Sequence, residues 1–217
     1  MHAFSTLDLG DPKDARTWVK GCTAKSLREE HCILSMSPTT EQLTAFFRGE
    51  PDWVYFSGHY NRRELWGDKT LAQIDFDRDN VTLNVRGQQT VLKKGTGALA
   101  LAESAKLVIW GGCNALAREP DVKVLRELFR NATLLGYSDF TGVAINNAML
   151  GGGFIKRAFF QRITSSAPSS QEIVNAWMGT AKAGYTGNSL QLRFRAVGTD
   201  GQEWKLVDGK VVKGVKY

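Results

Sequence analysis

The sequence predicts a single α/β domain built on a mostly parallel central sheet with helices on both faces. Three observations lead to this prediction. Strand-like and helix-like segments alternate along the chain. The strand-like segments are short, continuous apolar runs, as expected of strands buried on both faces of a parallel sheet. No repeat, low-complexity tract or linker divides residues 1–217, so we expect one domain.

The first half of the chain is polar for about thirty residues and then gives clear signals. In chain order we expect a helix, a strand, a helix, a strand, a small two-stranded hairpin and a helix: residues 14–22, 31–36, 40–48, 52–57, 71–76 with 81–85, and 97–104. The second of these helices is the best defined. Thr39 or Thr40 can cap it, Gln42 stands three residues after Thr39 as in a capping box, and Gly49 ends it.

The second half continues the alternation. We expect a strand, a helix, a strand, two helices and a C-terminal β-ribbon with two turns: residues 106–110, 121–130, 132–137, 145–163 and 171–183, with turns at 199–201 and 208–209. The two strands in this half are continuous apolar runs, which favours central positions in the sheet.

Composition limits the classes of protein to consider. With 42% hydrophobic residues, including 11 Phe, 6 Trp and 5 Tyr, the chain has too much apolar surface to remain disordered. The longest uncharged stretch, 140–155, contains four glycines and is too short to cross a bilayer, so we expect no membrane association. The N-terminus lacks the pattern of a secretory signal. Three cysteines without disulfide-like spacing indicate a reducing, cytoplasmic setting.

The net charge of 28 − 22 = +6 favours anionic partners in general. Lysines and arginines are scattered singly or in pairs, however, with no run of five or more. We therefore do not expect nucleic acid as a direct partner.

Two positions stand where reactive groups lie in α/β sheets, beyond the carboxyl ends of strands. Gly58-His59 follows the strand over 52–57, and Gly111-Gly112-Cys113 follows the strand over 106–110. If these strands are parallel neighbours, both side chains project over the same edge of the sheet. A cysteine nucleophile requires such a nearby base.

The residues around these positions resemble a known family. Trp53-Val-Tyr-Phe-Ser-Gly-His59 resembles the strand and Gly-His segment of caspase-fold cysteine peptidases, and Lys106-Leu-Val-Ile-Trp-Gly-Gly-Cys-Asn-Ala115 resembles their strand and Cys segment, closest to CHAT and separase-like domains. The resemblance covers roughly residues 32–160. It implies a caspase-like sandwich and a cysteine endopeptidase that needs no cofactor and no metal. Its partners would be a protein or peptide substrate and, as an open alternative, a regulatory or sensor protein.

The resemblance also implies roles for individual residues. Cys113 would attack the scissile carbonyl, His59 would move the proton, and the backbone N–H groups of Cys113 and Tyr60 would hold the oxyanion. The family has glycine where this chain has Tyr60, so the tyrosine side chain leaves open how freely a substrate can lie there.

Specificity is expected to depend on Asp139. The segment Leu134-Leu-Gly-Tyr-Ser-Asp139 resembles the strand and loop where separase and CHAT proteins carry an acid that pairs with a basic P1 residue. A buried acid in this role would contribute about 3–5 kcal/mol. The alternative is a turn-forming Asp that caps local amides.

Two alternatives to an enzyme remain open. The chain could be a catalytically silent caspase-fold module that binds or scaffolds, since Tyr60 departs from the family pattern, or a basic nucleic-acid-associated protein. A Gly-Thr-Gly segment at 95–97 only weakly matches a dinucleotide fingerprint.

Overall fold

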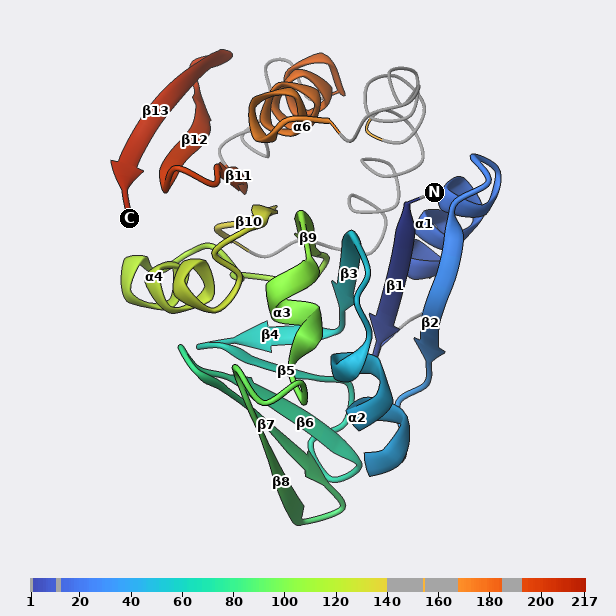
Figure 1. Cartoon of the computed structure of the whole chain (residues 1–217). Coiled ribbons are helices and arrows are strands. Elements are labelled where there is room, and N and C mark those ends of the chain that lie inside the picture. Colours follow the sequence, from blue (N-terminus) through green and yellow to red (C-terminus); the bar gives the residue numbers. More distant parts are fainter. Residues whose placement is uncertain (1, 11–12, 140–153, 155–167, 185–192) are drawn as a thin grey trace.

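Two sheets organise the molecule (Figure 1). The computed structural model describes residues 2–10, 13–139, 154, 168–184 and 193–217. The strands of the larger sheet are β1 (Ala3–Asp8), β2 (Arg28–Leu34), β3 (Trp53–Ser57), β9 (Leu107–Trp110), β10 (Thr133–Tyr137), β11 (Phe194–Val197), β12 (Gln202–Val207) and β13 (Lys210–Lys216). Those of the smaller sheet are β4 (His59–Asn61), β5 (Glu64–Trp66), β6 (Ala72–Phe76), β7 (Asn80–Val85) and β8 (Gln88–Lys93). The described helices are α1 (Lys13–Thr23), α2 (Thr40–Arg48), α3 (Ala100–Ser104), α4 (Glu119–Leu128) and α6 (Ser170–Gly184).

The larger sheet is mixed, with strand order β13-β12-β11-β10-β9-β3-β1-β2. The five strands from β2 to β10 are parallel, whereas β11, β12 and β13 run antiparallel to their neighbours. The prediction of a parallel sheet therefore holds only for the five strands from β2 to β10. The predicted C-terminal ribbon is present, but β11 joins it edge to edge to β10, so it extends the central sheet (Figure 1).

Helices cover both faces of this sheet, as the sequence predicts. Along β3, Trp53 and Tyr55 point into one hydrophobic core, where α1 and α6 pack. Val54 and Phe56 point into the other core, which α2, α3, α4 and the smaller sheet share. Strands buried on both faces give the continuous apolar runs seen in the sequence.

The predicted capping box of α2 is confirmed. The Thr39 hydroxyl accepts a hydrogen bond from the Gln42 N–H at 3.2 Å, and the Gln42 side-chain oxygen accepts one from the Thr39 N–H at 2.8 Å. The apolar face that follows is buried in the second core: Leu43, Phe46 and Phe47.

The small hairpin of the prediction is in fact the middle of a five-stranded antiparallel sheet, β4-β5-β6-β7-β8. The hairpin itself corresponds to β6 and β7. The additional strands β4 and β5 have three residues each and are joined at Arg62 and Arg63, whose φ angles of 47° and 71° are those of a type I′ turn. The smaller sheet therefore begins at His59, and Gly58 alone separates it from the end of β3.

The prediction missed β1, which lies between β2 and β3 in the parallel half. The predicted helix over 145–163 lies outside the described residues, apart from Phe154. That side chain is buried against Trp177 of α6, with ring centroids 5.4 Å apart.

Candidate active site at the carboxyl edge of the sheet

The strands that precede His59 and Cys113 are parallel neighbours. The register of β3 and β9 runs from Trp53 opposite Leu107 to Phe56 opposite Trp110. The pairing continues beyond β9, because the Gly111 N–H donates to the Phe56 carbonyl oxygen at 2.7 Å. The condition under which both side chains project over one edge of the sheet is therefore met.

Beyond the strands, the two segments are in backbone contact at Gly112. A Cβ atom on Gly112 would lie 2.9 Å from the carbonyl oxygen of Gly58 and 2.7 Å from the Cβ of Tyr60. Only glycine can approach so closely. The residues on both sides of His59 therefore touch the residue immediately before Cys113.

His59 is placed by a change of direction at Gly58. Gly58 has φ +141°, and a Cβ there would lie 2.8 Å from the carbonyl oxygen of Trp66. The chain leaves the central sheet at this glycine and enters β4. His59 is opposite Trp66 of β5, with ring centroids 6.0 Å apart, and is exposed to solvent.

The side chain of Tyr60 does not cover this edge. It is 3% exposed and packs in the second core against Trp110, with ring centroids 5.1 Å apart. Because β4 and β5 are joined by a two-residue turn, Tyr60 and Leu65 form the non-hydrogen-bonded pair of the hairpin. This alternation directs the Tyr60 N–H away from β5, and a Cβ on Gly112 would lie 3.5 Å from that nitrogen.

Cys113 is half-buried, and the loop that follows it is attached to the end of β10. The Asn114 N–H donates to the Asp139 carbonyl oxygen at 3.2 Å, and the Leu116 N–H donates to the Tyr137 carbonyl oxygen at 2.9 Å. Asn114 has φ +59°, a left-handed conformation that asparagine tolerates. Three strand ends, of β3, β9 and β10, are therefore tied together around Cys113.

Asp139 lies on the same rim but is open to solvent. Its side chain is 61% exposed, and one carboxylate oxygen is 3.6 Å from Nε of Arg193. The backbone holds the two residues together, because the Ser138 N–H donates to the Arg193 carbonyl oxygen at 2.7 Å. An exposed ion pair of this kind is screened by water, so the energy expected of a buried acid does not apply here.

The other histidines and cysteines lie elsewhere. His2 is near the amino end of β1, 3.5 Å from Asp52, and His31 is on the edge strand β2, which β1 separates from β3. Cys22 is buried, and burial raises the pKa of its thiol. Burial and then the charges of Glu29 and Asp8 raise the pKa of Cys32 to about 11. Thiols with raised pKa values are poor nucleophiles near neutral pH.

One residue at this edge was missed by the sequence prediction. Asp8 ends β1 beside Ser57, is fully buried, and accepts a hydrogen bond from the Gly10 N–H at 2.7 Å. A Cβ on Gly10 would lie 3.2 Å from the Cα of Gly58. Asp8 therefore orders a loop that packs behind the turn to His59. The apolar Ala3, Phe4 and Leu7 were the available signal for β1, but Ser5 and Thr6 between them concealed it.

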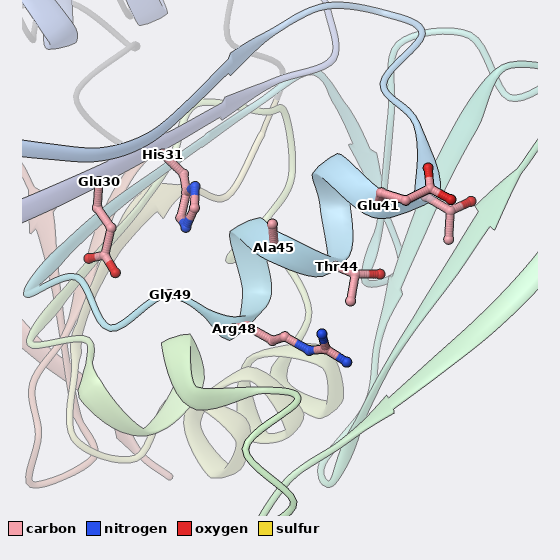
Figure 2. A pocket seen from close by; sticks show the side chains of 8 residues that line it. Glu30, His31, Glu41, Thr44, Ala45, Arg48 and Gly49 are labelled. Atoms are coloured by element: carbon pink, nitrogen blue, oxygen red, sulfur yellow. The ribbon is translucent and has the colours of Figure 1, made fainter.

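A groove of about 560 Å³ lies between β2 and α2 (Figure 2). Glu30 and His31 border it from β2, because a bulge makes Glu30 an extra residue opposite β1. Thr44 and Arg48 border it from the exposed face of α2. This groove brings charged side chains together without a cysteine, so it offers no site for the predicted thiol chemistry.

Within the described ranges, no group of three or more His, Cys, Asp or Glu residues is gathered as a metal ion would require. No helix among the same residues is both long and apolar enough to cross a bilayer. Comparison with protein-family models gives no match, and comparison with curated proteins gives none either.

Proposed function

We propose that this protein is a cysteine endopeptidase in which Cys113 is the nucleophile and His59 the general base. The observation that carries the proposal is the contact at Gly112. It joins the segment bearing the exposed histidine to the segment bearing the half-buried cysteine, at the carboxyl edge of two parallel strands. This edge is where α/β sheets hold their reacting groups.

The chemistry follows from these groups. His59 takes the proton from the Cys113 thiol, and the thiolate adds to the carbonyl carbon of a peptide bond. The backbone N–H groups of Cys113 and Tyr60 are the donors for the resulting oxyanion, and the outward direction of the Tyr60 N–H suits this role. The C–N bond then breaks as His59 returns the proton to the leaving amine. Water, deprotonated by His59, hydrolyses the thioester and regenerates the thiol.

The resemblance to caspase-fold peptidases gains support from the topology. The parallel half has the order β2-β1-β3-β9-β10, with His59 after the third strand of the chain and Cys113 after the next parallel strand. The burial of the Tyr60 side chain removes the obstacle that its size presents in the sequence. We further propose Asp139 as the group that favours a basic P1 residue, since its loop is hydrogen-bonded to the loop of Cys113.

The dyad is tested with four single variants and a mixture of peptides whose products are identified by mass. Cys113→Ala and His59→Ala should each lower the cleavage rate by at least about a thousandfold. Both side chains lie at the rim, so each change should alter the free energy of unfolding by less than about 1 kcal/mol. Cys32→Ala and His31→Ala are the matched controls and should cleave at the wild-type rate.

Alkylation gives an independent measurement. Iodoacetamide at pH 7 should modify Cys113 before Cys22 or Cys32, because burial raises the pKa values of the other two thiols. Near wild-type cleavage by either dyad variant would show that the assignment is wrong. A wild-type chain that cleaves none of the peptides would favour a binding module.

A further inference from the structure

Tyr60 contacts both segments of the proposed dyad, the one that carries His59 and the one that carries Cys113. Its backbone follows His59 directly, and its Cβ is the atom nearest to the position that a side chain on Gly112 would take. Its ring lies in the core against Trp110, the last residue of β9 and three residues before Cys113. One side chain therefore contacts both ends of the segment that leads to Cys113.

The hydroxyl group of Tyr60 has no evident part in this contact. It is buried and has no hydrogen-bond partner among the described residues. Burial, followed by the charge of Asp121, raises the pKa of this phenol, so it stays protonated and neutral. The ring makes the contact with Trp110, whereas the Cβ of Tyr60 makes the contact with Gly112.

We propose that Tyr60 is a positioning residue whose ring sets the spacing between His59 and Cys113. This inference depends on the proposed function, since it assigns a role within that site. A smaller side chain at position 60 lets β4 approach or tilt on Trp110, which moves His59 relative to the loop of Cys113. Hydrogen bonding and ion pairing between His59 and Cys113 are sensitive to shifts of about 1 Å.

Phe76 of β6 is the matched control, because it packs on Trp110 in the same core but does not adjoin His59 in the chain. Its ring is fully buried and lies 5.0 Å from the same indole ring of Trp110. Its truncation removes similar apolar contact from Trp110. A purely structural role for Tyr60 predicts that the two truncations behave alike.

The test measures the rate of Cys113 alkylation by iodoacetamide from pH 5 to 9, with Cys22 and Cys32 resolved by mass mapping. The variants are Tyr60→Leu, Tyr60→Val, Tyr60→Phe, Phe76→Leu and His59→Ala, each checked for folding by thermal melting. We expect His59→Ala to move the midpoint upward, because it removes the partner that stabilises the thiolate. Tyr60→Leu and Tyr60→Val should also move the midpoint upward, by about one pH unit. Below the midpoint this shift makes alkylation about tenfold slower. Tyr60→Phe and Phe76→Leu should keep the wild-type midpoint.

The outcomes distinguish a failure of the role of Tyr60 from a failure of the dyad. If His59→Ala moves the midpoint but Tyr60→Leu and Tyr60→Val do not, or if Phe76→Leu moves it as far as they do, the role of Tyr60 is overturned and the dyad stands. If His59→Ala leaves the profile unchanged, the dyad itself is wrong and the positioning role fails with it. Should Tyr60→Leu not fold, Tyr60→Val decides, and loss of the wild-type midpoint in Tyr60→Phe would also contradict the role assigned to the ring.

Discussion

At the scale of single residues, Gly112 makes the closest approach at the proposed site, and this position has no room for a larger residue. Gly112→Ala would place a methyl group 2.9 Å from a backbone carbonyl oxygen that cannot move without displacing the turn at Gly58. We expect a loss of about 1–3 kcal/mol in the free energy of unfolding, as in overpacked cores. Cleavage and rapid alkylation of Cys113 should fall together.

Gly179 in α6 provides the matched control for this substitution. A Cβ there meets nothing within 4 Å, so Gly179→Ala should raise stability by up to about 1 kcal/mol and leave cleavage unchanged. Denaturant melts and cleavage rates of both variants provide the measurement. A Gly112→Ala protein as stable and active as wild type would contradict the close contact.

The ion pair of Asp139 and Arg193 makes the proposed specificity measurable. A basic P1 side chain has to compete with Arg193 for an exposed carboxylate, so the gain is limited to about 1 kcal/mol, or about fivefold in kcat/KM. Asp139→Asn should lower kcat/KM on Arg-P1 peptides by about that factor and leave neutral-P1 peptides unaffected. Arg193→Ala should raise kcat/KM on Arg-P1 peptides, because it removes the competing arginine.

Asp77→Asn is the matched control for this pair. Asp77 is also 61% exposed and lies 3.3 Å from an arginine, Arg63, but at the end of β6 in the smaller sheet. It should change neither kcat/KM value. Equal losses on basic and neutral peptides in Asp139→Asn would rule out the P1 role.

The placement of His59 and Cys113 beyond the ends of two strands could be predicted, because each follows a continuous apolar run, and the ends of such strands are visible in a sequence. The surroundings of Asp139 could not. Arg193 is 54 positions away along the chain and reaches it only because the segment before β11 returns antiparallel beside β10. The role of Asp8 was equally hidden, since buried hydroxyls in β1 give it a polar composition.

At the scale of elements, α2 shows how a local signal supports the core. Thr39→Ala removes one of the two capping bonds and should lower the free energy of unfolding by about 1 kcal/mol, or about 2–4 °C in Tm. The rings of Phe46 and Phe47, which this helix buries, lie 5.9 Å and 6.2 Å from Phe56 of β3. A change in the stability of α2 should therefore affect β3, the strand before His59, through these ring contacts.

Thr44→Ala is the control for the cap, because Thr44 is in the interior of the same helix, where alanine is the better helix former. Thermal melting should give a Tm equal to or above that of wild type for this variant. If both substitutions lower Tm alike, the capping hydrogen bonds of Thr39 do not contribute the stability assigned to them.

Only β6 and β7 of the smaller sheet were predicted, because short strands leave little pattern in a sequence. β4 and β5 have three residues each, too few for an alternating pattern, and the turn between them is Arg62-Arg63 instead of the Asn-Gly that signals a type I′ turn. β8 is polar apart from the exposed Val91 and the one buried side chain, Leu92. Its place in the sheet follows from pairing with β7, which is a tertiary property.

At the scale of the whole molecule, the sheet divides into a parallel half that carries the proposed site and an antiparallel half that closes the other side. The antiparallel half contributes to the site through the segment before β11, where Arg193 meets the rim. Some of the charges on that side are paired within the fold. Arg195, for example, is 3.5 Å from Glu203, with both side chains largely buried. Lysines and arginines are scattered along the chain with no run of five or more, so the net charge of +6 gives little information about a partner.

The connection between Cys113 and β10 leads to a last prediction, that the active form is one uncut chain. This connection contains α4, which buries Val122, Leu125 and Leu128. Arg126 adds two hydrogen bonds of 2.7 Å from its guanidinium to the carbonyl oxygens of Phe129 and Ala132, which fix the end of the helix to the start of β10. A protease must unfold this segment before it can cut it.

Limited digestion with trypsin provides the measurement, because the chain contains an internal comparison. Arg86 is exposed in the two-residue turn between β7 and β8 and should be cut early, whereas Lys123 and Arg126 in α4 should be cut only as the whole domain unfolds. The intact mass of protein labelled at Cys113 should equal the full chain plus one label. An active form with a new terminus between Cys113 and Ala132 would contradict the prediction, because it would mean that the loop of Cys113 reaches its working geometry only after α4 is released from β10.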